Sequence, residues 1–319
     1  MLFKPETAGS EDDNMFIKRL FSTIILLGLF GAAIFAPDPV NKIVFLLLSS
    51  LLTFGLVREI CDIVKNLGME TFKNISASLC MLIVFLINFN FCLIFSNYHR
   101  SISITLSAAG YALLFSIALG GPLFILFSKN SGEKIKKLFN SMGISFFVLL
   151  PVLFIMGIYL IGDASAGRNS SMYRFNYYFL IFVLLTKIGD IGAYVVGTVS
   201  NKLMKGGNHK MIPSISPGKS WEGAAGGLIV SILLAIAFHF LFPQAEVVGS
   251  FPIAIITGIL MFFGSMAGDL MESALKRAAG VKDSGTTIPG IGGVFDLVDS
   301  LFVTAPLAAL IFLFLTFFH

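Results

Sequence analysis

Long apolar runs separated by short polar loops dominate the sequence from residue 17 to its end. A helix needs roughly 20 apolar residues to cross the hydrocarbon core of a bilayer, and these runs repeatedly approach that length. They lack the alternation of apolar and polar residues that a membrane β-barrel requires. The pattern therefore predicts an all-α, polytopic membrane protein with about nine transmembrane helices, at residues 17–36, 43–57, 76–96, 102–127, 142–162, 176–197, 223–243, 251–275 and 295–318.

The amino-acid composition also indicates that the protein is embedded in a lipid bilayer. Of the 319 residues, 56% are hydrophobic and only 13% are charged, and the mean hydropathy is +0.90. A water-soluble domain could not bury this much apolar surface. The net charge of +4 sits mainly in loops, where it suits anionic lipid head groups, and it implies no nucleic-acid partner.

The basic residues gather in loops on one side of the expected spans, the side of the N-terminus. Positively charged loops stay in the cytoplasm, so we expect a cytoplasmic N-terminus and a C-terminus outside. The compactness of the chain favours a bacterial inner membrane. The first apolar run has no small-residue cleavage site and is expected to remain as a span.

Polar residues divide the chain into three regions. We expect a polar N-terminal tail at 1–14, a transmembrane scaffold at 15–170 and a transmembrane catalytic region at 171–319, where polar side chains fall inside or against the spans. One charged group lies outside the catalytic region, after the second span at helical spacing. It predicts either an interfacial helix or, as we favour, a solvated helix face, and consists of Arg58, Glu59, Asp62 and Lys65.

Two acidic residues lie at membrane depth, where an ionised group costs about 2.5–3.5 kcal/mol without a partner. Asp190 either lines a polar cavity or pairs with Lys187, three residues earlier. Asp269 begins a stripe on one helix face that continues with Glu272, Ser273 and Lys276. The stripe is typical of a site, although an amphipathic helix end would also explain its last lysine.

A Gly- and Pro-rich stretch at 284–293 precedes Asp296 and Asp299, which fall in the first turns of the last span. Glycines allow close approach of the backbone, and amides at a helix start favour an anion. Carboxylate oxygens suit a hard divalent ion that keeps phosphate in its shell. The stretch predicts a magnesium–phosphate site, unless the two acids only stabilise the helix dipole.

A third polar segment, residues 215–227, holds a Gly-Lys-Ser sequence that is not a Walker loop. Pro213 occupies the position of the first required glycine, and no strand–helix context is expected before it. Lys219, between Ser216 and Glu222, can still hold a phosphate as a point charge. A polar loop that caps the seventh span is the alternative.

The run SALKRAAGVKDSGTTIPGIGGVFDLVD resembles the signature of the phosphatidate cytidylyltransferases, SxLKRxxxxKDxGxxxPGHGGxxDRxD. It matches without a gap at Ser273, Leu275, Lys276, Arg277, Lys282, Asp283, Gly285, Pro289, Gly290, Gly292, Gly293, Asp296 and Asp299. The family's DxxAYxxG and SPxKTxEG are also similar to segments here, at Asp190, Ala193, Tyr194 and Gly197 and at Ser216, Pro217, Lys219, Ser220 and Glu222. Two positions depart from the signature, because Ile291 replaces its histidine and Leu297 its arginine.

The resemblance implies transfer of a cytidylyl group from CTP to phosphatidic acid, in a cavity within the membrane that faces the cytoplasm. It implies Mg²⁺, with room for a second cation, held by Asp269 and Asp296. The other implied catalytic residues are Lys276, Asp283 and Asp299, and the implied substrate-binding residues are Asp190, Ser216, Lys219, Ser220, Glu222, Ser273, Arg277, Lys282, Gly292 and Gly293.

The expected partners are CTP, phosphatidic acid and membrane lipids, and a homodimer is compatible with this interpretation. Three other functions remain open from the residues. A CTP-dependent lipid-alcohol kinase shares the architecture and the nucleotide. A secondary transporter also places acids and broken helices in the membrane, and the changes at Ile291 and Leu297 leave room for a non-catalytic relative.

Overall fold

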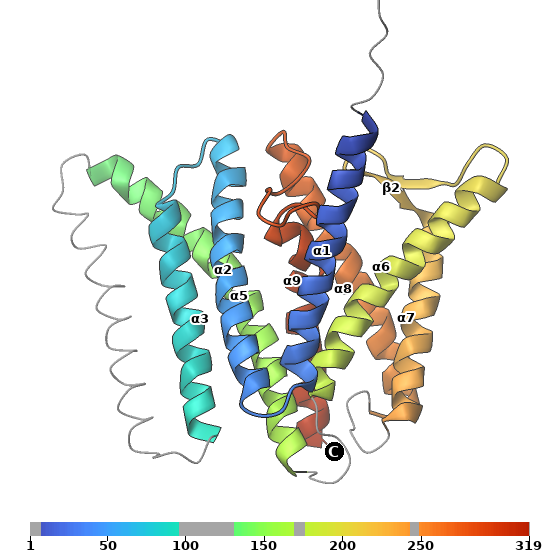
Figure 1. Ribbon diagram of the computed structural model, residues 1–319. Helices are drawn as coiled ribbons and strands as arrows, with labels where there is room; N and C mark the ends of the chain where they lie inside the picture. The colour runs from blue at the N-terminus through green and yellow to red at the C-terminus, as the bar shows by residue number, and fades with distance from the viewer. Residues whose placement is uncertain (1–7, 96–130, 169–175, 243–248, 319) are drawn as a thin grey trace, which may run out of the picture. The chain divides into compact units, whose positions relative to one another are not determined.

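The computed structural model describes residues 8–95, 131–168, 176–242 and 249–318 (Figure 1). Within these ranges, eight helices are long and apolar enough to cross a membrane, which confirms the prediction of an all-α polytopic protein. The expected span at 102–127 lies outside the described residues. The helices are α1 (Ala8–Phe35), α2 (Val40–Asn66), α3 (Lys73–Phe95), α5 (Ser131–Arg168), α6 (Tyr177–Leu203), α7 (Trp221–Leu241), α8 (Phe251–Ala278) and α9 (Val294–Phe318).

The chain forms two compact units that do not follow the order of the sequence. The first unit comprises residues 1–148 together with 281–297, and the second comprises 149–280 together with 298–319. The loop before α9 and the first residues of that helix therefore belong with the N-terminal helices. The remainder of α9 belongs with α6, α7 and α8.

In the first unit, α1 packs on α2 and α2 packs on α3 (Figure 1). Helix α1 begins at Ala8, so part of the expected polar tail is helical. Helix α2 is longer than the predicted span and includes the charged group at its end. Arg58, Asp62 and Lys65 are exposed, as a solvated face requires, but Glu59 is only 4% exposed. The predicted solvated face is therefore wrong for Glu59.

In the second unit, α6, α7 and α8 pack against one another through small residues. A Cβ atom on Gly227 would lie 2.5 Å from the Gly189 carbonyl oxygen, and one on Gly258 would lie 2.7 Å from the Ile232 Cα atom. Because no side chain stands between these backbones, α7 approaches both neighbours closely. Small residues at such contacts are typical of helices that associate inside a bilayer.

A short antiparallel hairpin joins α6 to α7 and was not predicted. Its strands are β1 (Lys210–Ile212) and β2 (Ser216–Ser220). Ser220 ends β2 and caps α7, because its Oγ atom accepts a hydrogen bond from the Gly223 amide at 3.1 Å. The hairpin lies at the end of the second unit where α6 ends and α7 begins (Figure 1). It fixes the backbone direction of the segment that carries Lys219.

Candidate active site

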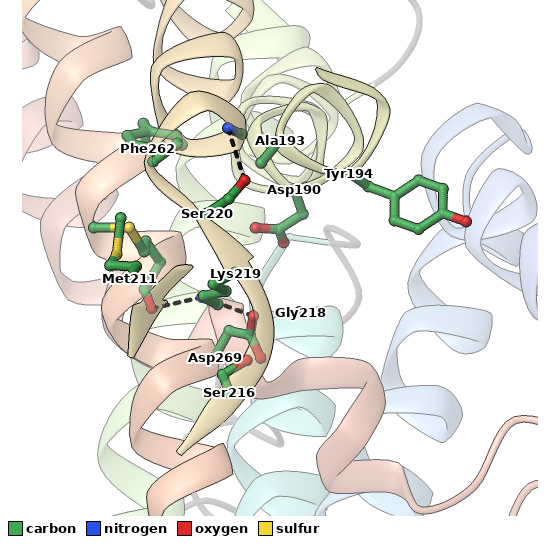
Figure 2. Close-up of a pocket in the computed structure, with 13 residues that line it drawn as sticks. Asp190, Ala193, Tyr194, Met211, Ser216, Gly218, Lys219, Ser220, Phe262 and Asp269 are labelled. Carbon is green, nitrogen blue, oxygen red and sulfur yellow. Dashed lines mark hydrogen bonds and ion pairs between the residues drawn. The ribbon is translucent and has the colours of Figure 1, made fainter. Parts of the chain in front are cut away.

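A cavity of about 240 Å³ opens beside the hairpin in the second unit (Figure 2). The C-terminal halves of α6 and α8, the hairpin and the start of α7 supply its walls. Five of the residues predicted from sequence to form the site line this one cavity, which brings together segments up to 79 positions apart: Asp190, Ser216, Lys219, Ser220 and Asp269. Tyr194, which also lines it, is 74% exposed and points away from this group (Figure 2).

Lys219 reaches across the cavity from the hairpin to α8. Its Nζ atom lies 2.8 Å from Asp269 Oδ2 and donates a hydrogen bond to the Met266 carbonyl oxygen at 3.3 Å (Figure 2). The Lys219 side chain is 19% exposed and that of Asp269 is 34% exposed. The pair is therefore partly accessible, as a phosphate-binding lysine must be. Ser220, in contrast, serves as the cap of α7, which was the alternative left open for this segment.

Asp190 and Lys187 have different partners although they lie on one face of α6. Asp190 Oδ1 accepts a hydrogen bond from the Ser265 Oγ atom at 2.8 Å. Lys187 Nζ lies 3.4 Å from Asp299 Oδ1 and donates to Ser300 Oγ at 2.6 Å. Within the described residues, the ion pair of Lys187 is thus with Asp299 on α9.

Three carboxylates gather next to the cavity in the second unit. One ligand oxygen from each of Asp269, Glu272 and Asp299 lies within 4.8 Å of the others. The side chains of Glu272 and Asp299 are 3% and 13% exposed. Lys276 Nζ lies 3.0 Å from Glu272 Oε2, so each acid of this carboxylate cluster has one lysine beside it. Buried charges are tolerated in such pairs, and far less so alone.

The carboxylate cluster could hold a hard divalent cation. Mg²⁺ takes oxygen ligands at about 2.0–2.1 Å, so two ligands on opposite sides of the ion stand roughly 4.2 Å apart. The observed spacing of up to 4.8 Å is close to that limit. The predicted stripe on α8 thus provides Asp269, Glu272 and Lys276, although the residues implied by the resemblance did not include Glu272. Lys187 was considered only as a partner of Asp190.

The carboxylate cluster depends on close contact between α8 and α9. A substitution at this contact therefore tests how the cluster is assembled. A Cβ atom on Gly268 would lie 2.5 Å from the Asp299 carbonyl oxygen. We expect Gly268→Ala to lower the free energy of unfolding by about 1–3 kcal/mol and to reduce activity, because the helices must separate. Thermal unfolding in detergent measures the first effect.

Gly157→Ala is the matched control, since nothing lies within 4 Å of the added Cβ atom in α5. It should leave stability unchanged or raise it, because alanine favours a helix. Equal thermal stability of the Gly268→Ala and Gly157→Ala variants would contradict the close contact between α8 and α9.

Asp296, a predicted metal ligand, belongs to the first unit. Its Oδ2 atom accepts hydrogen bonds from the Gly293 amide at 2.8 Å, the Ser284 amide at 3.2 Å and the Ser284 hydroxyl at 2.9 Å. These bonds close the Gly- and Pro-rich loop at 284–293. They give Asp296 a structural role beside any role in metal binding, which stays a prediction.

Backbone conformation and close contacts explain why glycine occupies two positions of this loop. Gly292 has a φ of +125°, which side chains rarely allow. A Cβ atom on Gly293 would lie 2.5 Å from Glu59 Oε2 and 2.8 Å from the Gly285 amide nitrogen. Ile291, at the position of the signature histidine, lies in the tight turn closed by the bond from the Ile288 amide to the Gly292 carbonyl oxygen. Substrate binding by Gly292 and Gly293 stays a prediction.

Glu59 holds the loop at 284–293 to α2 and was missed from the sequence. Its carboxylate accepts hydrogen bonds from the hydroxyls of Ser284 at 3.2 Å and Thr287 at 2.5 Å. It also accepts bonds at 2.9 Å from the amides of Val294 and Phe295, at the start of α9. A buried carboxylate from a distant helix therefore caps α9. Helical spacing placed Glu59 on α2, but no sequence signal distinguished it from its exposed neighbours.

The remaining predicted residues lie on α8, in the loop that follows it and at the start of α7. Ser273 is half-buried on α8 and Arg277 is exposed at the end of that helix. Lys282 and Asp283 are exposed in the loop of the first unit. Glu222 lies at the start of α7, where its Oε1 atom is 2.5 Å from the Nδ1 atom of His209.

Fold and site together define a class of integral membrane protein in which one lysine–carboxylate pair lines a cavity and two further pairs complete a carboxylate cluster beside it. The model of the cytidylyltransferase family matches residues 17–315. The match covers nearly the whole chain, so the chain belongs to the cytidylyltransferase family.

Several curated relatives share a shorter segment. The phosphatidate cytidylyltransferase of Haemophilus influenzae is 43% identical over 133 residues, which are 40% of this chain and 43% of the relative. Phosphatidate cytidylyltransferase 5, chloroplastic, of Arabidopsis thaliana is 43% identical over 131 residues, 40% of this chain and 31% of the relative. The Bacillus subtilis phosphatidate cytidylyltransferase is 40% identical over 144 residues, 44% of this chain and 48% of the relative. The matched segment thus spans less than half of each relative.

Proposed function

We propose that the protein transfers a cytidylyl group from CTP to phosphatidic acid and produces CDP-diacylglycerol and pyrophosphate. The observation that carries this proposal is the carboxylate cluster with its three lysines beside the cavity of the second unit. Membership of the cytidylyltransferase family and the names of the relatives give the nucleotide and the lipid.

In this reaction, a phosphate oxygen of phosphatidic acid attacks the α-phosphorus of CTP. A phosphorus–oxygen bond forms there as the bond to the β-phosphate oxygen breaks, and pyrophosphate leaves. Such chemistry depends on positioning and on neutralising negative charge. In this proposal Lys219, which pairs with Asp269, binds a phosphate in the cavity, and Lys276 and Lys187 hold the other two acids of the carboxylate cluster in position.

A bound Mg²⁺ would act as a Lewis acid and neutralise negative charge on the phosphates, including the charge that develops on the leaving pyrophosphate. Asp269, Glu272 and Asp299 are the residues that would hold it. When triphosphate enters, the lysines can exchange a carboxylate for a phosphate partner, because both are anionic oxygens. A second cation, which the resemblance implies, stays a prediction.

The surroundings of the reaction follow from the same reasoning. The protein is an integral membrane protein, and we propose the inner membrane of a bacterium, with the N-terminus in the cytoplasm and the C-terminus outside. The cavity then faces the cytoplasm, where CTP is dissolved, and the lipid arrives from the bilayer. The second unit carries the chemistry in this proposal, and a homodimer is compatible with it.

Position-specific labelling of CTP tests the proposed reaction. Purified protein in detergent, given Mg²⁺ and phosphatidic acid, should incorporate the label of the α-phosphorus of CTP into lipid. It should release the labels of the β- and γ-phosphorus as pyrophosphate. Incorporation of the γ-label into a lipid alcohol would instead indicate a kinase. No incorporation with any of several lipid phosphates would contradict an enzymatic function and leave the transporter and the non-catalytic relative.

A further inference from the structure

A second cavity lies in the first unit and has no role in the proposed chemistry so far. It measures about 530 Å³, within the range of roughly 300–1,000 Å³ that ligand pockets occupy. Its apolar wall comes from α1 and α2, and its other wall comes from the end of α2 and the loop at 284–293. Every residue that lines it belongs to the first unit.

The lining changes from apolar to polar along α2. Leu51, Leu52 and Phe54 precede Arg58 by one to two turns, a distance of up to about 10 Å along the helix axis. Leu51 is 64% exposed, and an exposed leucine in a membrane-spanning helix faces lipid. The predicted second span ends at residue 57, which places Arg58 at the boundary between apolar core and head groups. A phospholipid has the same order of apolar and charged parts over the same depth.

Of the two cations that line this cavity, Arg58 is the one without an ion-pair partner among the described residues. Lys73 Nζ lies 2.5 Å and 2.6 Å from the two carboxylate oxygens of Asp62. Glu59 is turned into the loop, where four donors satisfy its carboxylate. Among the described residues Arg58 forms no ion pair, and its guanidinium carbon lies 5.5 Å from the centroid of the Phe54 ring.

We propose that this cavity binds the phosphate of a membrane lipid, with Arg58 as the phosphate-binding cation and the leucines of α1 and α2 against the acyl chains. A guanidinium binds phosphate through two parallel hydrogen bonds and pairs more strongly than an ammonium. The apolar wall favours a lipid over a water-soluble phosphate. Naming phosphatidic acid as the preferred lipid rests on the proposed function, and the site itself does not.

The test measures binding of phosphatidic acid to the purified full chain in detergent, without CTP, by native mass spectrometry. Phosphatidylcholine with the same acyl chains and glycerol 3-phosphate are the comparison ligands. We expect phosphatidic acid to bind more tightly than either. Arg58→Gln should weaken its binding about tenfold, because one charge-assisted contact to phosphate is lost. Arg58→Lys should retain part of the affinity.

Lys65→Gln is the control, since Lys65 is an exposed cation of the same helix outside the cavity. It should bind phosphatidic acid like the parent. Unchanged affinity of Arg58→Gln would overturn the proposal, as would equal binding of phosphatidylcholine. Equal binding of glycerol 3-phosphate would show that the apolar wall contributes nothing and would overturn the assignment to a lipid.

Turnover assays on the same preparations separate the two proposals. A chain that binds phosphatidic acid through Arg58 but does not use CTP would contradict the reaction and keep the site. A chain that makes CDP-diacylglycerol while Arg58→Gln binds lipid normally would contradict the site alone.

Discussion

Asp269→Asn is expected to lower the rate of pyrophosphate release roughly 10²–10³-fold while the protein stays folded. The amide keeps the size of the side chain but removes the charge that faces Lys219 at 2.8 Å and contributes to the carboxylate cluster. The Asp269 side chain is 34% exposed, so the substitution leaves no fully buried group without a partner. Initial rates with CTP and phosphatidic acid measure the loss.

A magnesium titration distinguishes a ligand of the metal from a residue needed only for the fold. If Asp269 is a ligand, the Mg²⁺ concentration for half-maximal rate should rise in the variant, by about 10–100-fold. Glu133→Gln is the control, because this exposed carboxylate lies 3.5 Å from Lys137 and outside both cavities. It should keep the parent's rate and magnesium requirement. A fully active Asp269→Asn would refute the proposed catalytic role.

Glu59→Ala should destabilise the protein by roughly 3–5 kcal/mol, more than any other single change considered for the first unit. The variant removes the shared acceptor of two hydroxyls and two backbone amides, and Glu59 is only 4% exposed. Water reaches such a buried group poorly, so the donors lose most of their compensation. Activity should fall with stability, because the loop at 284–293 and the start of α9 lose their anchor on α2. The midpoint of thermal unfolding in detergent reports the effect.

Glu59→Gln refines this prediction, since it keeps one acceptor oxygen and turns an NH₂ group toward the donors. Its stability should fall between those of the parent and Glu59→Ala. Glu133→Ala removes an exposed carboxylate and should change stability by no more than about 0.5 kcal/mol. If Glu59→Ala unfolds at the same temperature as Glu133→Ala, the hydrogen bonds to the loop carry no net stability.

The hydrophobic pattern alone predicted the membrane-spanning helices that the structure describes. Eight predicted spans coincide with eight apolar helices of the described residues, because a long apolar run in a bilayer has no alternative to satisfying its backbone within a helix. Local spacing also placed Asp269, Glu272 and Lys276 on one face of α8, since side chains three and four positions apart meet on any helix. The hairpin before α7 was missed because its strands are too short to show a pattern.

Only the tertiary structure decided which partner each charge has. Lys187 pairs with Asp299 rather than with its sequence neighbour Asp190, and Glu59 reaches a loop more than 220 positions away. Both choices depend on which helix faces pack together, and apolar patterning does not reveal those faces because lipid and neighbouring helices are equally apolar. A sequence therefore fixes where a charged residue stands on its own helix, whereas the neighbouring helix determines whether that residue is exposed, neutralised or part of a site.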